Sequence, residues 1–453
     1  MVRAQTRRHR RTLWSALLTG VGGASLAVAA GAWWQHTGES PPNILIVTMC
    51  SWRLERIGAY GGTSGSTPRF DALAAKSIVF DHAWSNGVYT SVAHAALLTG
   101  RYPEGNGLID ATSTIDRSVP TLPEILKLYG YHTLAWTTAN APLSFRAQDG
   151  FERGFDRFDQ PETSAQGRVA RFAPPESPWL AVAHVKDTHV PYDVDGQSAN
   201  DPNPVIQEWL TRTRRRLPGD PDPDAWVAEQ FATDPEAKTA LLRRYDADLH
   251  SGDARLGELL DTLGDQLEDT VVIVVGDHGD ALGEHGRIGH GALEPEVAHV
   301  AMIIHLPGES PRRVTDDVSL VDLMPTLLDL ANATPPAVRD GRDLMPLLRG
   351  QPVAAVPAVV QFLRRAPQHT ALIGWDGFAQ GDRWEACDRE GHLCRAWAFS
   401  AGAWSSAAPD AALVAEGRAS LKNTALSVEG RAATEAERNA IRTAGYWQAV
   451  PEP

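Results

Sequence analysis

Three short apolar runs constrain the fold of this chain more than any other feature of its sequence. They are rich in Val, Ile, Leu and Ala, show no regular alternation of polar and apolar positions, and lie at residues 43–48, 179–183 and 271–275. Such runs are typical of strands buried on both faces of a sheet. Helical patterns lie between them, at residues 69–77, 121–129 and 241–263. Strands that alternate with helices predict an α/β fold with a central, mostly parallel sheet flanked by helices.

The order of these patterns also predicts the organisation of the chain. A length of 453 residues suits one large domain and a small appendage. We expect residues 1–40 to be an export signal or membrane anchor, 41–350 the large domain, and 351–453 a small C-terminal α+β subdomain with a last helix at 434–444. Two stretches rich in Pro, Asp, Arg and Gly, at residues 160–178 and 199–224, predict surface insertions. A further amphipathic helix is expected at residues 318–330.

The first forty residues have the pattern of an export segment. Arginines cluster before an Ala/Gly/Leu-rich run at residues 13–33, and the Arg10-Arg11 pair suits a twin-arginine signal. The run is also close to the roughly 20 residues that a spanning helix needs, so an uncleaved membrane anchor stays open. Either way, the sequence predicts a periplasmic or extracellular protein with possible membrane association through this segment.

Charge excludes one class of partner. The net charge is −14, and it becomes −18 without residues 1–40, because those hold five arginines and one glutamate. A body this acidic repels polyanions, so we expect no nucleic-acid partner, and a small anionic substrate must be held by a local site. Three cysteines do not form a disulfide scaffold. Cys387 and Cys394 could pair in an oxidising compartment, which leaves Cys50 alone.

Polar residues that follow the apolar runs carry a family resemblance. The stretch PNILIVTMCSWRLERIGAYGG resembles the opening of sulfatases, members of the alkaline phosphatase superfamily, in which an aspartate after the first strand binds the metal. Cys50 stands at that aspartate here. Residues 90–103, TSVAHAALLTGRYP, resemble the nucleophile signature of the family, with Thr90 at the nucleophile and His94 at the basic residue after it. Threonine cannot be oxidised to an aldehyde, so formylglycine is excluded at Thr90.

Two further motifs complete the resemblance, which covers residues 41–350 well and the remainder loosely. HVKDTHVPY, residues 184–192, places His189 at a histidine that faces the substrate anion in the family. GDHGDALGEHGRIGHGALEPEVAHVAMII, residues 276–304, places Asp277 and His278 at metal ligands and His290 at a cationic substrate contact. The resemblance implies the alkaline phosphatase/sulfatase fold and one divalent metal ion. Thiolate, carboxylate, imidazole and hydroxyl ligands favour zinc at this site, with calcium, magnesium or manganese as alternatives.

The sequence leaves two classes of function open, an enzyme and a binding protein. The favoured one is a metal-dependent hydrolase of sulfate or phosphate esters, in which Thr90 attacks and His94, His189 and His290 handle the anion. A head-group transferase near the membrane is a variant of this chemistry. The rival is a catalytically inactive sulfatase-fold protein that binds anions or a partner, since the loss of a hard carboxylate at Cys50 is also what a decayed metal site would show.

Overall fold

The computed structural model describes residues 41–137, 144–160, 175–193, 201–216, 220–365, 372–400 and 403–421. The proposed export segment and the helix expected at 434–444 lie outside these residues, as do parts of both surface insertions, so those assignments stay predictions. Within the described ranges, no helix is both long and apolar enough to cross a membrane.

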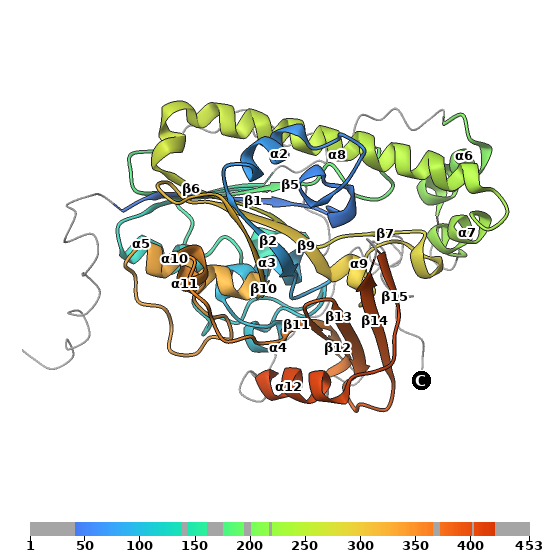
Figure 1. Cartoon of the computed structure of the whole chain (residues 1–453). Helices are drawn as coiled ribbons and strands as arrows, with labels where there is room; N and C mark the ends of the chain where they lie inside the picture. The colour runs from blue at the N-terminus through green and yellow to red at the C-terminus, as the bar shows by residue number, and fades with distance from the viewer. Residues whose placement is uncertain are drawn as a thin grey trace, which may run out of the picture. The chain divides into compact units, whose positions relative to one another are not determined.

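An eight-stranded sheet forms the centre of the structure (Figure 1). Its order is β10-β2-β9-β6-β1-β5-β3-β4, and all pairings are parallel except those of β9 with β2 and β6. The strands are β1 (Asn43–Met49), β2 (Ile78–Trp84), β3 (His132–Trp136), β4 (Arg157–Asp159), β5 (Trp179–Val185), β6 (Thr270–Gly276), β9 (His299–His305) and β10 (Arg312–Ser319). The predicted α/β class with a mostly parallel sheet is confirmed.

Both faces of the sheet are covered, which explains the runs without alternation. In β1, Ile44 and Ile46 join the core beneath α3, α5 and α10, whereas Leu45 and Val47 join the core beneath α2 and α8 (Figure 1). The α-helices are α2 (Pro68–Ala74), α3 (Thr90–Thr99), α4 (Pro103–Asn106), α5 (Leu122–Leu128), α6 (Pro204–Arg215), α7 (Pro223–Gln230), α8 (Pro235–Leu263), α9 (Pro295–Ala298), α10 (Leu323–Leu330), α11 (Met345–Leu348) and α12 (Ala411–Leu421).

One expectation about a helix is corrected. The helix expected at 318–330 begins only at Leu323, because Val318 and Ser319 pair with β2 as the end of β10. A 3₁₀ turn over Leu320–Asp322 with a capping box joins the strand to the helix. The stretch proposed as the second insertion contains α6, which buries Ile206, Trp209 and Leu210.

A second, antiparallel sheet of five strands lies toward the C-terminus (Figure 1). Its strands run in sequence order as β11 (Ala358–Arg365), β12 (Leu372–Gln380), β13 (Arg383–Asp388), β14 (Cys394–Ser400) and β15 (Ala403–Ser406). Stacking of Trp84 on Trp384, at 5.3 Å between ring centroids, and a hydrogen bond from Asn86 Nδ2 to Val359 O join it to the large sheet. The proposed boundary at residue 350 stays a prediction, since the described residues on its two sides belong to one compact unit.

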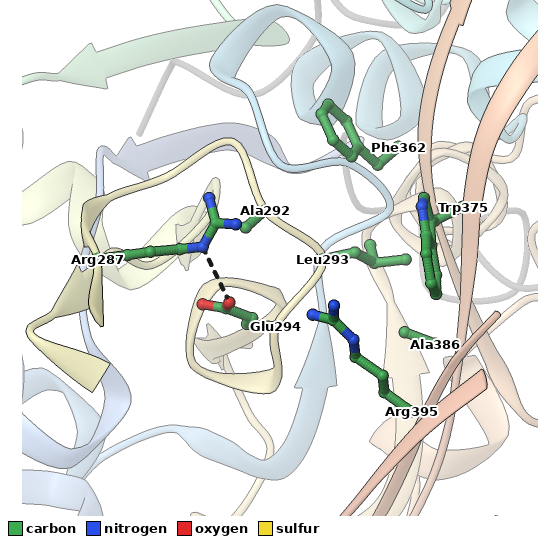
Figure 2. A pocket seen from close by; sticks show the side chains of 8 residues that line it. All are labelled: Arg287, Ala292, Leu293, Glu294, Phe362, Trp375, Ala386 and Arg395. Atoms are coloured by element: carbon green, nitrogen blue, oxygen red, sulfur yellow. Dashed lines mark ion pairs between the residues drawn. The ribbon is translucent and has the colours of Figure 1, made fainter. Parts of the chain in front are cut away.

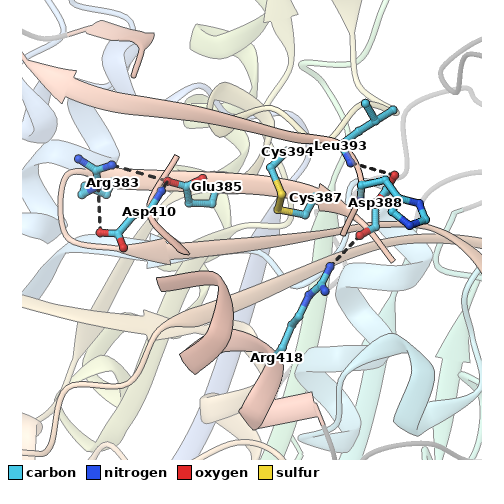
Figure 3. The surroundings of a disulfide bond; sticks show 9 residues. Arg383, Glu385, Cys387, Asp388, Leu393, Cys394, Asp410 and Arg418 are labelled. Atoms are coloured by element: carbon cyan, nitrogen blue, oxygen red, sulfur yellow. Dashed lines mark hydrogen bonds and ion pairs between the residues drawn. A yellow bond between two sulfur atoms is a disulfide. The ribbon is translucent and has the colours of Figure 1, made fainter. Parts of the chain in front are cut away.

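One disulfide crosslinks the C-terminal sheet (Figure 3). Cys387 on β13 and Cys394 on β14 are directly opposite partners in the strand pairing, so the anticipated bond forms without displacing the backbone. The bond closes a short loop, for which chain-entropy arguments give a stabilisation of about 2.5 kcal/mol. Arg418 of α12 donates a hydrogen bond to Asp388 O beside it, which fastens the helix to the same hairpin (Figure 3).

Candidate active site

The carboxyl ends of three neighbouring strands, β1, β5 and β6, meet at one edge of the central sheet. Cys50 directly follows β1, and its N–H donates to Val185 O on β5 at 2.8 Å. Asp277 directly follows β6, and its N–H donates to Met49 O on β1 at 3.2 Å. Ligands bind at this edge in open α/β sheets because the loops that leave the strands gather there.

Four polar groups converge at that edge. Thr90 Oγ1, in the first turn of α3, lies 3.8 Å from Cys50 Sγ and 3.3 Å from His278 Nε2. His278 Nε2 is 3.7 Å from Asp277 Oδ2. Cys50, Asp277 and His278 each offer one atom that could bind a metal ion, and these three atoms lie within 4.8 Å of one another. All three residues are buried. The predicted nucleophile and the predicted metal ligands are therefore brought together, although their chemical roles stay predictions.

Hydrogen bonds orient this group. His278 Nδ1 lies 2.9 Å from Gly279 O, and since a carbonyl only accepts, Nδ1 carries the proton and Nε2 presents a lone pair. Thr90 Oγ1 can therefore donate to His278 Nε2. Asp277 Oδ1 accepts from the N–H groups of His278 and Ser51, at 2.7 and 3.2 Å. Position 279 requires glycine, because a Cβ atom there would lie only 2.3 Å from Glu296 O.

The same group fits a divalent cation. Asp277 Oδ2 is buried and accepts no well-formed hydrogen bond from the described residues, although the Thr90 hydroxyl is near. A buried carboxylate oxygen left in that state is costly unless a cation meets it. Burial and the charge of Asp277 raise the pKa of the Cys50 thiol well above its usual range. A thiolate at Cys50 therefore needs a metal beside it, and a set of thiolate, carboxylate, imidazole and hydroxyl suits tetrahedral zinc.

His94 lies in the buried layer behind Thr90, and its role toward a substrate stays a prediction. Both of its ring nitrogens are engaged: Nδ1 donates to Thr90 O at 2.7 Å, and Nε2 lies 2.8 Å from Thr48 Oγ1. The ring also stacks on Phe145, with 4.6 Å between centroids. Because both nitrogens are used inside the core, His94 holds the first turn of α3 in place, and a direct contact with a substrate anion would require one of these bonds to break.

Two further residues of this buried layer were missed by sequence reasoning. Thr48 Oγ1 lies between His94 and His184, 3.0 Å from His184 Nδ1. Burial lowers the pKa of His184 to about 3, so its imidazole is neutral. His184 is the first histidine of the HVKDTHVPY motif, which was the available signal, whereas Thr48 inside an apolar strand gave none.

His189 and His290 lie together at the rim. Their ring centroids are 5.3 Å apart, and the centroid of His290 is 4.2 Å from that of His278. His290 Nδ1 is 2.7 Å from Asp280 Oδ1, and the other oxygen of Asp280 accepts from the Tyr192 hydroxyl at 2.9 Å. The Asp280 carboxylate thus fixes the orientation of the His290 ring. Tyr192 was part of a quoted motif but had been given no role.

A pocket lies next to this rim, between residues 287–294 and the C-terminal sheet (Figure 2). Its cavity volume is about 40 Å³. It is lined by Arg287, Ala292, Leu293, Glu294, Phe362, Trp375, Ala386 and Arg395. Sequence reasoning could not find it, because its two walls are far apart in the chain and neither has a motif.

Glu294 is the acidic residue of this pocket. Its side chain is 6% exposed, Oε1 pairs with Arg287 Nε at 3.5 Å, and Oε2 has no hydrogen-bond partner among the described residues. Burial is the main cause that raises the pKa of Glu294 to about 7. The charge of Glu296 acts in the same direction, and those of His285, Arg287 and Arg395 oppose it.

We expect this carboxyl to make stability depend on pH. Folded Glu294 keeps its proton up to about pH 7, whereas the unfolded chain loses it near the ordinary value of 4.5. The folded state therefore binds more protons between these values, and its stability falls as pH rises through that window, by on the order of 3 kcal/mol for a shift of this size. Urea unfolding at pH 5 and 7.5 should show a smaller fall for Glu294→Gln than for the wild type. Glu258→Gln, on the exposed face of α8, is the control and should behave like the wild type.

Comparison with known proteins adds three kinds of likeness. A family model described as Sulfatase matches residues 42–333. The chain is 27% identical over 401 residues to human N-acetylgalactosamine-6-sulfatase, covering 75% of this chain and 74% of that protein. It is 24% identical over 368 residues to a delta 4,5-hexuronate-2-O-sulfatase of Bacteroides thetaiotaomicron, covering 69% and 73%.

Solved structures show the same architecture. A phosphonate monoester hydrolase of Agrobacterium radiobacter superposes with a TM-score of 0.61 at 20% identity, over 79% of this chain and 89% of that one. A 2-O GAG sulfatase superposes with a TM-score of 0.66 at 20% identity, over 84% and 91%. At this level of identity the superpositions show a shared fold.

Proposed function

The chain belongs to the sulfatase family, and from that premise we propose that it is a metal-dependent hydrolase of sulfate or phosphate esters with Thr90 as its nucleophile. The observation that carries the proposal is the convergence of Thr90 Oγ1 with Cys50, Asp277 and His278 at the carboxyl edge of the sheet. A hydroxyl held among metal-binding groups is the arrangement that attack on a tetrahedral oxyanion requires.

The reaction proceeds by in-line displacement. Cys50, Asp277 and His278 would hold a divalent cation, which would offset the charge of the ester oxygens and lower the pKa of the Thr90 hydroxyl when bound. The Thr90 oxygen then forms a bond to sulfur or phosphorus while the bond to the ester oxygen breaks. His290 gives a proton to that departing oxygen, which leaves as an alcohol. Burial lowers the pKa of His189 well below its ordinary value, so His189 is the less suited proton donor. Water attacks the same central atom and releases Thr90 together with inorganic sulfate or phosphate.

Threonine bears on which ester is preferred. A formylglycine diol has a second hydroxyl that can expel sulfate, whereas an ester on Thr90 has to be opened by water at the central atom. This chemistry is more natural for phosphoryl than for sulfuryl transfer. The relatives named above are sulfatases of sugar substrates, and a solved neighbour is a phosphonate hydrolase, so esters of all three acids belong in the test.

We place the protein outside the cytoplasm. The arginine-rich start followed by an apolar run supports export, with cleavage or membrane anchoring both open. The disulfide between Cys387 and Cys394 supports the same proposal, since such bonds persist in oxidising compartments.

The decisive experiment measures metal content and turnover on the same preparation. Purified protein should contain about one zinc ion per chain and should hydrolyse at least one of 4-nitrophenyl sulfate, 4-nitrophenyl phosphate and 4-nitrophenyl phenylphosphonate. Dialysis against a chelator should remove the activity, and added zinc should restore it. Absence of both bound metal and turnover across the panel would favour the inactive anion-binding protein, for which the loss of a carboxylate at Cys50 is the supporting feature.

A further inference from the structure

The pocket beside the rim joins three kinds of binding group (Figure 2). Arg287 and Arg395 supply two guanidinium groups, Glu294 supplies a buried carboxyl, and Phe362 and Trp375 supply aromatic surface. The chain as a whole has a net charge of −14, so a pocket with more cationic than acidic groups stands out locally. Guanidinium groups recognise carboxylate and sulfate oxygens through paired N–H donors.

Arg395 is the cation that is free to bind a ligand. Its side chain is exposed on β14 and makes no ion pair with any residue that the structure describes. The guanidinium carbon of Arg395 lies 5.7 Å from the centroid of the Trp375 ring. This cation–π contact keeps the guanidinium group at the pocket. Figure 2 shows the Arg395 side chain directed toward Glu294 and Leu293.

The carboxyl group of Glu294 is a second, independent indication that the pocket binds a ligand. Its Oε2 atom is buried in the pocket wall with no hydrogen-bond partner among the described residues. A buried acceptor in this state is costly, and a hydroxyl of a bound molecule would satisfy it. The nearby aromatic faces suit the apolar face of a hydroxylated ring.

The residue before the nucleophile connects the pocket to the rim of the active site. Tyr89, the residue before Thr90, contacts both the pocket and the rim, with ring centroids 5.8 Å from Phe362 and 6.0 Å from His290. Glu294 follows His290 by four residues, a length of chain that spans at most about 14 Å. The Tyr89 ring therefore links the pocket wall to the histidine rim of the candidate active site.

The volume limits what enters. A water molecule needs roughly 10–15 Å³ of such space. The cavity of about 40 Å³ therefore admits one or two ring substituents, and the ring itself stays at the mouth.

We propose that this pocket binds the non-reacting side of the substrate, and that the substrate is an ester of a hydroxylated ring carrying a second anionic group. Arg395, with Arg287, contacts that second anion, Glu294 contacts a ring hydroxyl, and Trp375 contacts the ring face. This inference rests on the proposed ester hydrolysis for its kinetic test, but binding in the pocket can be measured without turnover.

The test compares two sugar esters that differ only in the second charge, glucose 2-sulfate and glucuronate 2-sulfate, or the matching phosphates if phosphate is preferred. Arg395→Ala should raise KM for the glucuronate ester at least about tenfold, the value expected for loss of a hydrogen bond to a charged group. For the glucose ester the change should stay within about twofold. Arg395→Lys should recover part of the loss, because it keeps the charge without the planar fork.

Arg243→Ala, on the exposed surface of α8, is the matched control and should leave both substrates unaffected. Equal effects of Arg395→Ala on the two esters, or none on either, would overturn the proposal. If the wild type hydrolyses neither ester, calorimetric titration with glucuronate 2-sulfate decides between the two ideas. Binding weakened by Arg395→Ala would keep the pocket assignment while the proposed function fails, and binding unaffected by it would remove the pocket assignment as well.

Discussion

Thr90→Ala is expected to lower kcat by a factor on the order of 1,000 or more, because the substitution removes the attacking oxygen. Thr90 Oγ1 is the group that lies 3.3 Å from His278 Nε2 and 3.8 Å from Cys50 Sγ. Thr90→Ser keeps the hydroxyl and should stay within about tenfold of the wild type. Rates are measured on the aryl ester that the wild type hydrolyses fastest, at saturating substrate.

Ser91→Ala is the matched control for this loss. Ser91 is the next residue of α3 and is also buried, but its hydroxyl has no hydrogen-bond partner among the described residues. Removing it should leave kcat within about twofold of the wild type. Should Thr90→Ala keep more than a tenth of the wild-type kcat, water would be attacking directly, and the nucleophile assignment would be wrong while the metal site stood.

Cys50→Asp should change the metal that the protein holds. A carboxylate in place of the thiolate turns the mixed donor set into a harder one, which favours magnesium, calcium or manganese over zinc. We expect zinc affinity to fall about 100-fold and activity to become dependent on one of the harder cations. The measurement is metal content by mass spectrometry after dialysis against equal concentrations of the four metals, with activity assayed on the same samples.

Cys50→Ser separates loss of the thiolate from gain of a carboxylate. The serine hydroxyl has nearly the shape of the thiol but is a poor ligand for either class of metal, so this variant should bind all four metals weakly. A wild-type protein that selects calcium or magnesium over zinc would show that Cys50 does not ligate. Melting temperatures of all Cys50 variants should be compared, because Cys50 is fully buried.

The sequence predicted the core of the sheet well for a physical reason. Strands β1, β5 and β6 are covered on both faces, so each is a nearly continuous apolar run in the sequence. The local sequence pattern gave the wrong secondary structure where pairing with a distant strand decides the conformation. Val318 and Ser319 suit a helix by periodicity, but partners on β2 hold them in a strand.

The candidate site was predicted where the residues directly follow strands, and missed elsewhere. Cys50 and Asp277 leave adjacent strands, so their proximity follows from the topology. The engagement of His94 with Thr48 and with the carbonyl of Thr90 depends on side-chain directions in three dimensions, which spacing does not reveal. The pocket around Glu294 and Trp375 likewise depends on how the second sheet docks.

The disulfide has a consequence for selectivity. Ala386 and Arg395, both in the pocket wall, are paired residues directly adjacent to the paired Cys387 and Cys394. Thr90, Asp277 and His278 belong to the other sheet and its connections. The disulfide therefore crosslinks the two strands that carry this wall and does not involve the strands that carry the reacting groups. If the pocket selects the substrate as proposed, reduction of the bond should change selectivity between substrates more than kcat.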